Sequence, residues 1–566
     1  MDRRVIWAVV LMMLIALAPT FFRKPAERRN GRPADSALAG TTQGPARGTQ
    51  ARPDDTVPVV ARGDSTPLAT PGAPEDTIVV RSDIYTYGIS TRGARLVSAT
   101  MSRYRDTGRA EGGPADIARP GSGLLGLRLI AAGDTIGLDD WVFTPSATSL
   151  QVSGPTPLTL TGSDGVHSVE LTYTFTPDYR IGVAGRVTGL GPDGALALVD
   201  LGRGLRNTES DSTQNFGAYA VVVKDGGEAE RTNFRSIDAA ETQVLSGPFQ
   251  WVAIKSKYFV TALFALDSAE GSRGRVSGVR ASAPVARTRY EDDVHVVATL
   301  PVPATGTFAY SAYAGPLEYE RLRAIGHDFD DVNPYGWPGF RTIIRFFAVP
   351  VRWLLVQMHQ NLHLAYGVVL ILFGILVRIL LWPLNQKAMR ANMKMQEMQP
   401  HLKAAQDRYK ENPQQLQQEM FRLYKEYNVN PMSGCWPMLL PMPILFALFF
   451  VFQNAIELRG QPFLWLPDLS LKDPYYIIPL IMGGSMYVLS KVGMAGLPPN
   501  PQTKMMLYIM PVMMTFLFLN FASGLNLYYA VSNIASIPQQ WLLANERKKR
   551  AARAIVEVKT KKTKGR

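Results

Sequence analysis

Arg378 lies inside an apolar stretch, LHLAYGVVLILFGILVRILLWPL (362–384), that is long enough to cross a membrane as a helix. An ionised side chain near the centre of such a helix costs about 2.5–3.5 kcal/mol. Such a residue either extends its charge to a nearby membrane surface or lines a water-filled cavity. Arg378 lies about 9 Å along a helix from Leu384, so this segment alone leaves both alternatives open.

Other patterns that would support chemistry are weak. His359 and His363 have the one-turn spacing of a zinc-binding helix, but Gln360 stands where a metalloprotease needs its glutamate. GSGLLG (121–126) lacks the Lys-Ser/Thr of a phosphate-binding loop and is interpreted as a turn. Cys435 is the single cysteine, which excludes an intrachain disulfide. We therefore expect no cofactor, no metal and no enzymatic activity.

Five further apolar segments indicate a polytopic membrane protein. The first follows Arg3 and Arg4, and the others lie in the C-terminal third of the chain. The first is interpreted as an uncleaved signal anchor, because Pro19 follows the cleavage-like Ala16-Leu17-Ala18 and disfavours processing. With the helix of Arg378 this predicts six transmembrane helices, of which the last three are short.

Positive charge is concentrated in two segments. Residues 384–433 carry a net charge of +3 and residues 546–566 a net charge of +8, out of +13 for the chain. Basic loops face the cytoplasm, so both termini are predicted to be cytoplasmic. The basic tail is interpreted as a solvated tail, with contact to anionic lipid or ribosomal RNA as the alternative.

A large exported β domain is predicted between the first two membrane segments. Residues 23–75 are rich in Pro, Gly, Ala, Thr and Arg and are expected to be a disordered linker. From residue 76 short alternating runs follow, as in Val169, Leu171, Tyr173 and Phe175, and later in WVAIKSKYFVTALFAL (251–266). About 240 residues of this pattern favour one β-sandwich.

Two amphipathic regions flank the membrane segments. Residues 339–358 place Phe340, Ile343, Phe347, Val351 and Leu354 on one stripe, with Arg341, Arg345 and Arg352 largely off it. This predicts a helix lying on the outer membrane face and bent at Pro350, with a helix packed on the β domain as the alternative.

The second amphipathic region is cytoplasmic. Apolar residues from Ala388 to Tyr409, and again from Leu416 to Tyr427, repeat every three or four residues on either side of Pro413. The pattern predicts an antiparallel helical hairpin, which is either a spacer or a contact device for something arriving from the cytoplasm.

The chain resembles YidC-type membrane protein insertases. The likeness is close over about 340–545 and looser in the β region. It is carried by Arg378 followed by WPL, KMQEMQP (394–400), NPMSGCWPMLLPMPI (430–444), ELRGQPFLWLPDLSLKDPYYIIPLIMG (457–483), GLNLYYAVSN (524–533), IVVRSDIYTYGISTRGARL (78–96) and WVAIKSKYF (251–259).

The resemblance implies a five-helix core around a hydrophilic groove, which is open to cytoplasm and lipid and closed toward the periplasm. Arg378 would lie in this groove. The helices at 437–456 and 505–543 would form a slide for the incoming segment. The slide contacts carried over by alignment are Met442, Pro443, Pro511, Val512, Tyr528, Tyr529 and Ser532.

Two departures from the family pattern concern the groove. Gly374 stands one turn before Arg378, where members often have a polar residue, and Pro441 replaces a frequent glutamine before Met442. The groove is therefore expected to be less polar than usual, which leaves Arg378 a larger share of the work.

The sequence thus predicts a non-enzymatic insertase and folding chaperone of the bacterial inner membrane. Expected partners are nascent inner-membrane proteins, the lipid bilayer, Sec translocon components and the ribosome. Alternatives are an anion or solute transporter with Arg378 as binding charge, or a sensory or structural protein whose β domain binds an external ligand. Deleting 76–335 would abolish the function of a sensor, but we expect it to leave most insertion activity.

Each part of the predicted fold, a polytopic α-helical membrane protein with a periplasmic β-sandwich, corresponds to a range of the chain. These ranges are 1–22 (signal anchor), 23–75 (linker), 76–335 (β-sandwich), 339–358 (interfacial helix), 362–384 (second membrane helix), 385–432 (cytoplasmic hairpin), 437–456, 475–490, 505–521 and 525–543 (third to sixth membrane helices) and 546–566 (basic tail).

Overall fold

The computed structural model describes residues 76–109, 111–265, 276–286, 292–333, 335–336, 339–410, 412–426, 442–495 and 504–564. The predicted signal anchor and linker lie outside these residues. The described chain is a β-rich N-terminal part followed by a helical C-terminal part.

The β-rich part contains three sheets. The first has the order β4(Pro114–Asp116), β3(Leu96–Arg105), β2(Tyr85–Ser90), β1(Thr77–Arg81), β8(Ser149–Gln151). The second has the order β14(Glu230–Asn233), β13(Ala220–Lys224), β16(Trp251–Lys255), β17(Phe259–Ala265), β20(Thr307–Pro316), β11(Arg180–Thr188), β10(Ser168–Phe175), β9(Thr156–Ser163), β7(Thr144–Pro145). The third has the order β15(Thr242–Phe249), β18(Val276–Ser282), β19(His295–Val302), β12(Ala195–Gly202), β5(Gly126–Ala131), β6(Asp134–Gly137).

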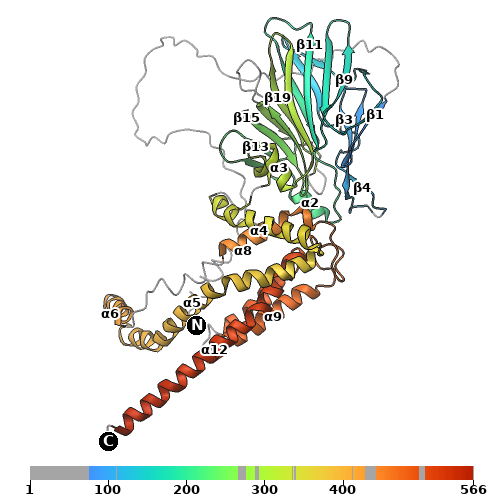
Figure 1. Ribbon diagram of the computed structural model, residues 1–566. Coiled ribbons are helices and arrows are strands. Elements are labelled where there is room, and N and C mark those ends of the chain that lie inside the picture. Colours follow the sequence, from blue (N-terminus) through green and yellow to red (C-terminus); the bar gives the residue numbers. More distant parts are fainter. Residues whose placement is uncertain are drawn as a thin grey trace, which may run out of the picture. The chain divides into compact units, whose positions relative to one another are not determined.

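The three sheets enclose one hydrophobic core, which makes this part the predicted β-sandwich. β10 buries Val169, Leu171, Tyr173 and Phe175 on one side, as the two-residue alternation predicted. Residues 251–265 form the antiparallel pair β16 and β17, as the predicted pair of strands, and both strands lie inside the largest sheet. Figure 1 shows long strands of two of these sheets, β9 and β11 from the second and β19 from the third. Position in the sheet explains why β16 and β17 are apolar on both faces.

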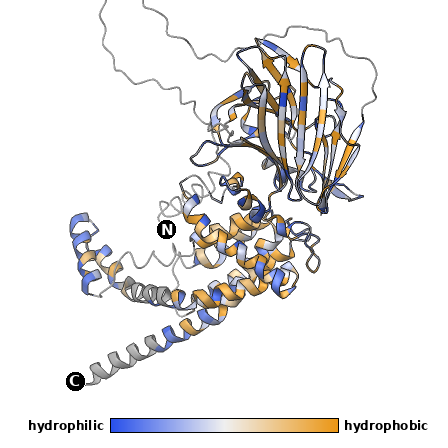
Figure 2. Ribbon diagram, turned by 45° about the horizontal axis from the view of Figure 1, so that its top comes forward, coloured by the Kyte–Doolittle hydropathy of each residue, from blue (hydrophilic) through white to orange (hydrophobic). Residues whose placement is uncertain are grey.

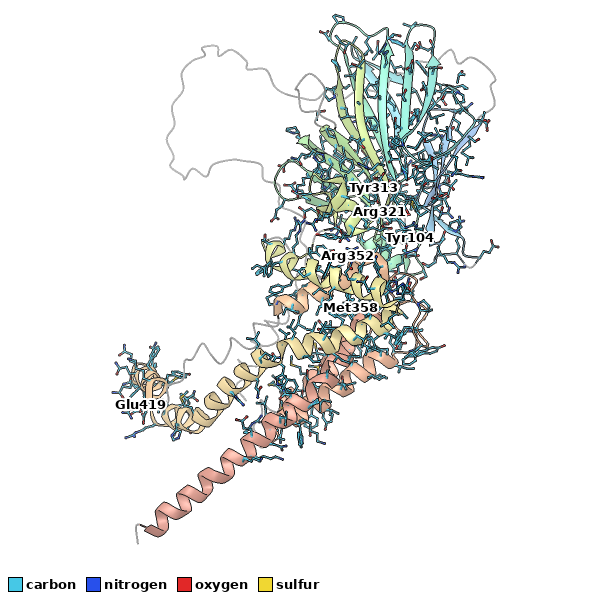
Figure 3. All side chains as sticks on the ribbon, viewed as in Figure 1. Tyr104, Tyr313, Arg321, Arg352, Met358 and Glu419 are labelled. Atoms are coloured by element: carbon cyan, nitrogen blue, oxygen red, sulfur yellow. The ribbon has the colours of Figure 1, made fainter. Side chains whose placement is uncertain are left out.

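Short helices connect or follow the strands. They are α2(Ser212–Gly217), η1(Phe234–Ser236), α3(Tyr319–Ile325) and η2(Phe329–Val332). Near one end of the sandwich, the Glu318 carboxylate accepts a hydrogen bond from the Tyr104 hydroxyl at 2.6 Å and pairs with Arg321. Arg321 also lies over the ring of Tyr179, which contacts Tyr313. Figure 3 labels Tyr104, Tyr313 and Arg321 of this partly buried group.

The C-terminal part is helical throughout its regular structure. Its elements are α4(Arg341–Leu362), α5(Tyr366–Arg408), α6(Pro413–Glu426), α8(Met442–Asn454), η4(Ile456–Leu458), α9(Ile477–Gly493), the π-helical η5(Met505–Ile509), α11(Met510–Phe518) and α12(Ser523–Lys564). Figure 2 shows hydrophobic residues dominating α9 and the first half of α12, whereas α12 becomes hydrophilic further on. In the described chain, one segment is long and apolar enough to cross a membrane, Tyr366–Gln386 of α5. The apolar helices Pro443–Asn454, Ile477–Gly493 and Met505–Phe518 are shorter.

Two helices extend beyond their predicted ends. α5 continues through Pro383 to Arg408, so the segment of Arg378 and the first half of the predicted hairpin are one helix. α12 continues past residue 543 to Lys564 and includes most of the predicted basic tail. In both cases the helix hydrogen bonds continue where the apolar pattern ends, because a change of solvent does not by itself terminate a helix.

The hairpin is buried along its predicted seam, whereas the most buried residues of α4 lie beside its predicted stripe. α5 and α6 pack through Met398, Leu402, Ala405, Leu416 and Leu423, five residues of the predicted seam. In α4 the buried residues are Ile344, Ala348, Arg352 and Leu355, whereas Phe340 and Ile343 of the predicted stripe are 61% and 51% exposed. Arg352 lies off that stripe, and its guanidinium is paired inside the protein.

Candidate functional site

The candidate site is formed where α5 crosses α12. The Arg378 Nε donates a hydrogen bond to the Ser532 hydroxyl oxygen at 2.7 Å. Ser532 is buried, and its carbonyl accepts a hydrogen bond from the Ser536 hydroxyl at 2.7 Å. One turn further, the Gln539 side-chain amide donates to the carbonyl of Trp382 at 2.9 Å. Polar side chains on one face of α12 therefore hold α5 against it.

Aromatic rings form the apolar side of this site. The Tyr528 ring is buried and lies 5.8 Å from Phe373 on α5 and 5.9 Å from Phe452 on α8. The Tyr529 ring contacts Tyr528 at 5.5 Å and Phe518 on α11 at 5.3 Å. Tyr528 and Tyr529 thus connect the helix of Arg378 to two other apolar helices.

Gly374 allows α5 and α12 to approach closely. A Cβ atom at this position would lie 3.3 Å from the Val531 Cγ1 and 3.6 Å from the Tyr528 ring. A larger polar side chain would therefore have to displace one of these neighbours. Gly374 therefore permits tight packing of α5 against α12, and it adds no polar group beside Arg378.

The charge of Arg378 has a neutral partner. Within the described residues, no carboxylate lies within ion-pair distance of its guanidinium, and Ser532 is its hydrogen-bond acceptor. The buried arginines outside this site differ: Arg352 pairs with Glu457 at 2.6 Å and Arg459 pairs with Glu209 at 2.9 Å. A half-buried cation without an anion attracts acidic groups of an incoming molecule.

The structure brings together some of the predicted slide residues. Tyr528, Tyr529 and Ser532 share α12 and adjoin Arg378. Pro443 is half-buried near the start of α8; Met442 begins that helix, but its side chain lies outside the described atoms. Pro511 is buried and Val512 is 69% exposed, at the end of α11 opposite to Phe518. The α11 residues therefore adjoin the Arg378 site through Phe518, and Pro511 and Val512 lie about two turns away.

Of the two histidines at one-turn spacing, His359 contacts the start of α5. The His359 ring stacks on Tyr366 at 3.9 Å, and its Nδ1 lies 2.8 Å from the Leu364 carbonyl oxygen. The described part of the chain contains no group of three His, Cys, Asp or Glu residues placed to hold a metal ion. His359 is accounted for as a residue that packs the end of α4 against the start of α5.

Sequence reasoning missed the charged residues of the α8–α9 connection. Glu457 and Arg459 stand two residues apart in ELRG, a motif used above only as part of a family likeness. Their partners, Arg352 and Glu209, are far away in the sequence. The signal in the sequence was a glutamate and an arginine on either side of Leu458, directly after the apolar segment 437–456.

A β-sandwich joined to apolar helices, one of which is long enough to span a bilayer and holds a half-buried arginine, defines a membrane protein with a large extramembrane domain. Two family models match adjoining parts of the chain: the "YidC periplasmic domain" matches residues 77–354 and the "60Kd inner membrane protein" matches residues 357–550. The chain belongs to the YidC family of membrane protein insertases. Proteins of this family are inner-membrane insertases with a periplasmic domain.

Curated relatives match nearly the whole chain. Membrane protein insertase YidC of Chlorobium luteolum is 30% identical over 573 residues, covering 96% of this chain and 95% of the relative. That of Chloroherpeton thalassium is 32% identical over 501 residues, covering 83% of each chain. A crystal structure of an active YidC insertase with its first transmembrane domain resolved is 18% identical, with a TM-score of 0.33, and covers 83% of this chain and 93% of that one.

Proposed function

We propose that this protein inserts membrane proteins by admitting their polar segments to a wet groove beside Arg378, and that it helps them to fold. The observation that carries the proposal is the Arg378–Ser532 hydrogen bond, which orients at a helix crossing a cation that has no anionic partner among the described residues. Moving a polar segment across hydrocarbon costs several kcal/mol for each unsatisfied group. A water-filled groove partway into the bilayer would shorten that dry path.

The charge of Arg378 would attract acidic residues of the segment to be moved. At about 4 Å two opposite charges attract by ~4 kcal/mol where the effective dielectric constant is about 20. After the polar segment has crossed, the apolar segment would leave sideways along a slide of Met442, Pro443, Pro511, Val512, Tyr528, Tyr529 and Ser532. Support for an open apolar face comes from the exposure of Val512 and Phe516 on α11.

The proposed topology has six transmembrane helices, with both termini in the cytoplasm. Besides α5, the shorter apolar helices α8, α9 and α11 and the first half of α12 would cross a locally thinned bilayer. The segment at residues 1–22 would be the sixth, as a signal anchor. α4 would lie on the periplasmic membrane face, and the exposed Phe346 and Trp353 on this helix support such a position.

Partners follow from this topology. Nascent inner-membrane proteins and the bilayer are the substrates and the medium of an insertase. We further propose that the protein works alone or beside the Sec translocon, and that the α5–α6 hairpin and the basic end of α12 contact the ribosome. These contacts would bring the nascent chain to the cytoplasmic opening of the groove.

Site-specific crosslinking in a depletion strain tests the proposal. A photoreactive residue at Met442 or Tyr529 should label a stalled nascent membrane protein. The same probe at Leu380, an apolar residue of α5 that is 73% exposed, serves as the control for a lipid-facing position. Labelling at Leu380 without labelling at Met442 and Tyr529 would exclude the slide. Thiol accessibility at position 378, measured with R378C in a C435S background, should be high from the aqueous phase; a dry position 378 would exclude the groove.

A further inference from the structure

Four consecutive residues, 456–459, connect the β-sandwich and the helical part: the outer two side chains contact the β-sandwich and the inner two contact the helical part. We propose that Glu457 is a positioning residue for insertion, because it fixes α4 against the end of α8, and that Arg459 holds the β-sandwich in place. This inference rests on the proposed function, whose subject is the groove at Arg378. It concerns the opposite, periplasmic end of α8.

The apolar residues of this segment go to different cores. Ile456 is 1% exposed and belongs to the hydrophobic core of the β-sandwich. Leu458 is 2% exposed and belongs to the hydrophobic core of the helical part. Both lie in the short helix η4, directly after α8. The segment therefore cannot move relative to either part without losing a buried contact.

Glu457 binds the helical side. Its Oε1 accepts hydrogen bonds from Arg352 on α4, at 2.6 Å from Nη2 and 3.2 Å from Nε. The Arg352 Nη1 donates to the Tyr335 hydroxyl oxygen at 2.7 Å, and the guanidinium lies 5.3 Å from the Tyr319 ring. Figure 3 labels Arg352 on α4. Arg352 is 5% exposed, so Glu457 is the anion that makes its burial tolerable.

Arg459 binds the β side. Its Nε lies 3.0 and 2.9 Å from the two carboxylate oxygens of Glu209, and its Nη2 donates to the Thr208 carbonyl at 3.1 Å. Its guanidinium also lies over the rings of Tyr258, in the turn before β17, and of Phe259, the first residue of β17. Both charged groups of this pair are buried.

Buried ion pairs of this kind specify position more than they add stability. The cost of desolvation offsets most of the attraction, but removing one partner leaves a buried charge without compensation. The connection supplies the anion of one pair, Glu457, and the cation of the other, Arg459. Together the two pairs fix the position of the connection relative to α4 and to the β-sandwich. Losing Glu457 should displace α4 from α8, whereas losing Arg459 should let the β-sandwich pivot about the remaining pairs of Arg345 with Asp330 and Asp331.

The first experiment measures client insertion in a depletion strain that carries the full-length chain, normalised to the amount of folded protein. E457Q keeps the size of the side chain and should lower insertion several-fold, and E457D, which keeps the anion, should recover most of it. The matched control is E228Q, because Glu228 also pairs with an arginine of α4, Arg341 at 3.3 Å, but is 62% exposed. E457Q inserting as well as E228Q, or E457D failing as E457Q does, would overturn the role of Glu457.

The second experiment measures the position of the β-sandwich by double electron–electron resonance between two spin labels in a C435S background. The two spin labels replace the exposed residues Glu170 on β10 and Lys472 in the α8–α9 connection. R459Q should widen the distance distribution and leave insertion near the wild-type level, whereas R203Q, which removes an exposed pair with Asp293, should change neither. An unchanged distribution in R459Q, or a loss of insertion equal to that of E457Q, would overturn the division of roles.

The two proposals fail independently. Normal insertion by E457Q together with crosslinks at Met442 and Tyr529 would remove this inference and keep the groove. Loss of those crosslinks in the wild-type chain would remove the groove, whereas the spin-label result for R459Q would stand.

Discussion

Arg378 of α5 and Ser532 of α12 are joined by a hydrogen bond of 2.7 Å, although 154 residues separate them in the sequence. A serine hydroxyl orients the guanidinium but does not neutralise it. This contrasts with Arg352 and Arg459, each of which is neutralised by a glutamate. Arg352 and Arg459 are thus buried and neutralised, whereas Arg378 is half-buried and has a serine hydroxyl as its hydrogen-bond partner.

R378A should lower insertion of a client with acidic residues in its translocated tail about tenfold. The loss corresponds to ~1.4 kcal/mol, a modest share of the attraction between two charges at this depth. R378K keeps the charge and should retain most activity, and S532A, which removes the hydrogen bond alone, should have a smaller effect. The measurement is insertion of paired clients with acidic and neutral tails; equal losses for both tails would contradict an electrostatic role.

The strands were predictable where burial is one-sided. β10 and β11 follow the alternation of Val169 to Val187 because one face of each strand meets the core and the other meets water. The order of strands was not predictable, because pairing such as that of β1 with β8 or β12 with β5 joins distant segments. Hydrophobic alternation states which face is buried, but not which neighbour covers it.

The ends of the helices were less predictable than the helices themselves. The predicted membrane segments end at residues 384 and 543, but α5 and α12 continue past these positions. At the site, the apolar stretch pointed to Arg378 and the resemblance to Ser532, and the structure supplied their contact. The Arg352–Glu457 pair could not be found from the sequence, because an arginine beside an apolar stripe looks the same whether it meets water or a buried carboxylate.

Lys255 should make the stability of the β-sandwich depend on pH. Burial, and then the charge of Arg231, lowers the pKa of the Lys255 ammonium well below its ordinary value. Its Nζ lies 2.6 Å from the Asn333 Oδ1, and among the described residues it has no carboxylate partner. Between its lowered pKa and the unfolded value of about 10.4, the unfolded chain binds more protons than the folded one. The free energy of unfolding should therefore rise with pH through that interval.

K255M tests this dependence. Methionine has a similar length and no charge to desolvate, so the variant should be at least as stable as the wild type near neutral pH and should lose the rise toward alkaline pH. The measurement is thermal unfolding of the full-length chain in detergent at several pH values, followed by tryptophan fluorescence, to which the buried Trp251 contributes. Parallel pH profiles for the two proteins would contradict a lowered pKa.

Gly306 should tolerate no side chain. Its φ is +72°, and a Cβ atom would lie 2.0 Å from the carbonyl oxygen of Val187, in the backbone of β11. Gly165 provides the matched control, since its φ is +91° but nothing lies within 4 Å of its Cβ position. G165A should cost about 1–2 kcal/mol for the backbone conformation alone. G306A should cost a further ~1–3 kcal/mol for the overlap, measured as the difference in unfolding free energy; equal costs would contradict the overlap.

Gly483 and Gly484 provide a matched pair inside the helical part. A Cβ atom at Gly483 would lie 1.8 Å from the Thr515 Oγ1 and 3.1 Å from the Thr515 Cβ, whereas nothing lies within 4 Å at Gly484. The Thr515 hydroxyl already donates to the Pro511 carbonyl at 2.7 Å, so it cannot turn away without losing that bond. Small residues of this kind allow helices to pack closely in a membrane. α9 and α11 therefore meet at Gly483.

G483A should separate α9 from α11 and lower the free energy of unfolding by about 1–3 kcal/mol, the usual cost of overpacking. G484A should change it by less than about 0.5 kcal/mol, as surface substitutions usually do. The measurement is thermal unfolding of the two variants in the same detergent. The double variant G483A/T515S should not recover stability, because the threonine Oγ1 and Cβ positions are kept; G483A/T515G removes both atoms and should recover part of it. Equal stability of G483A and G484A would contradict a close approach of these helices.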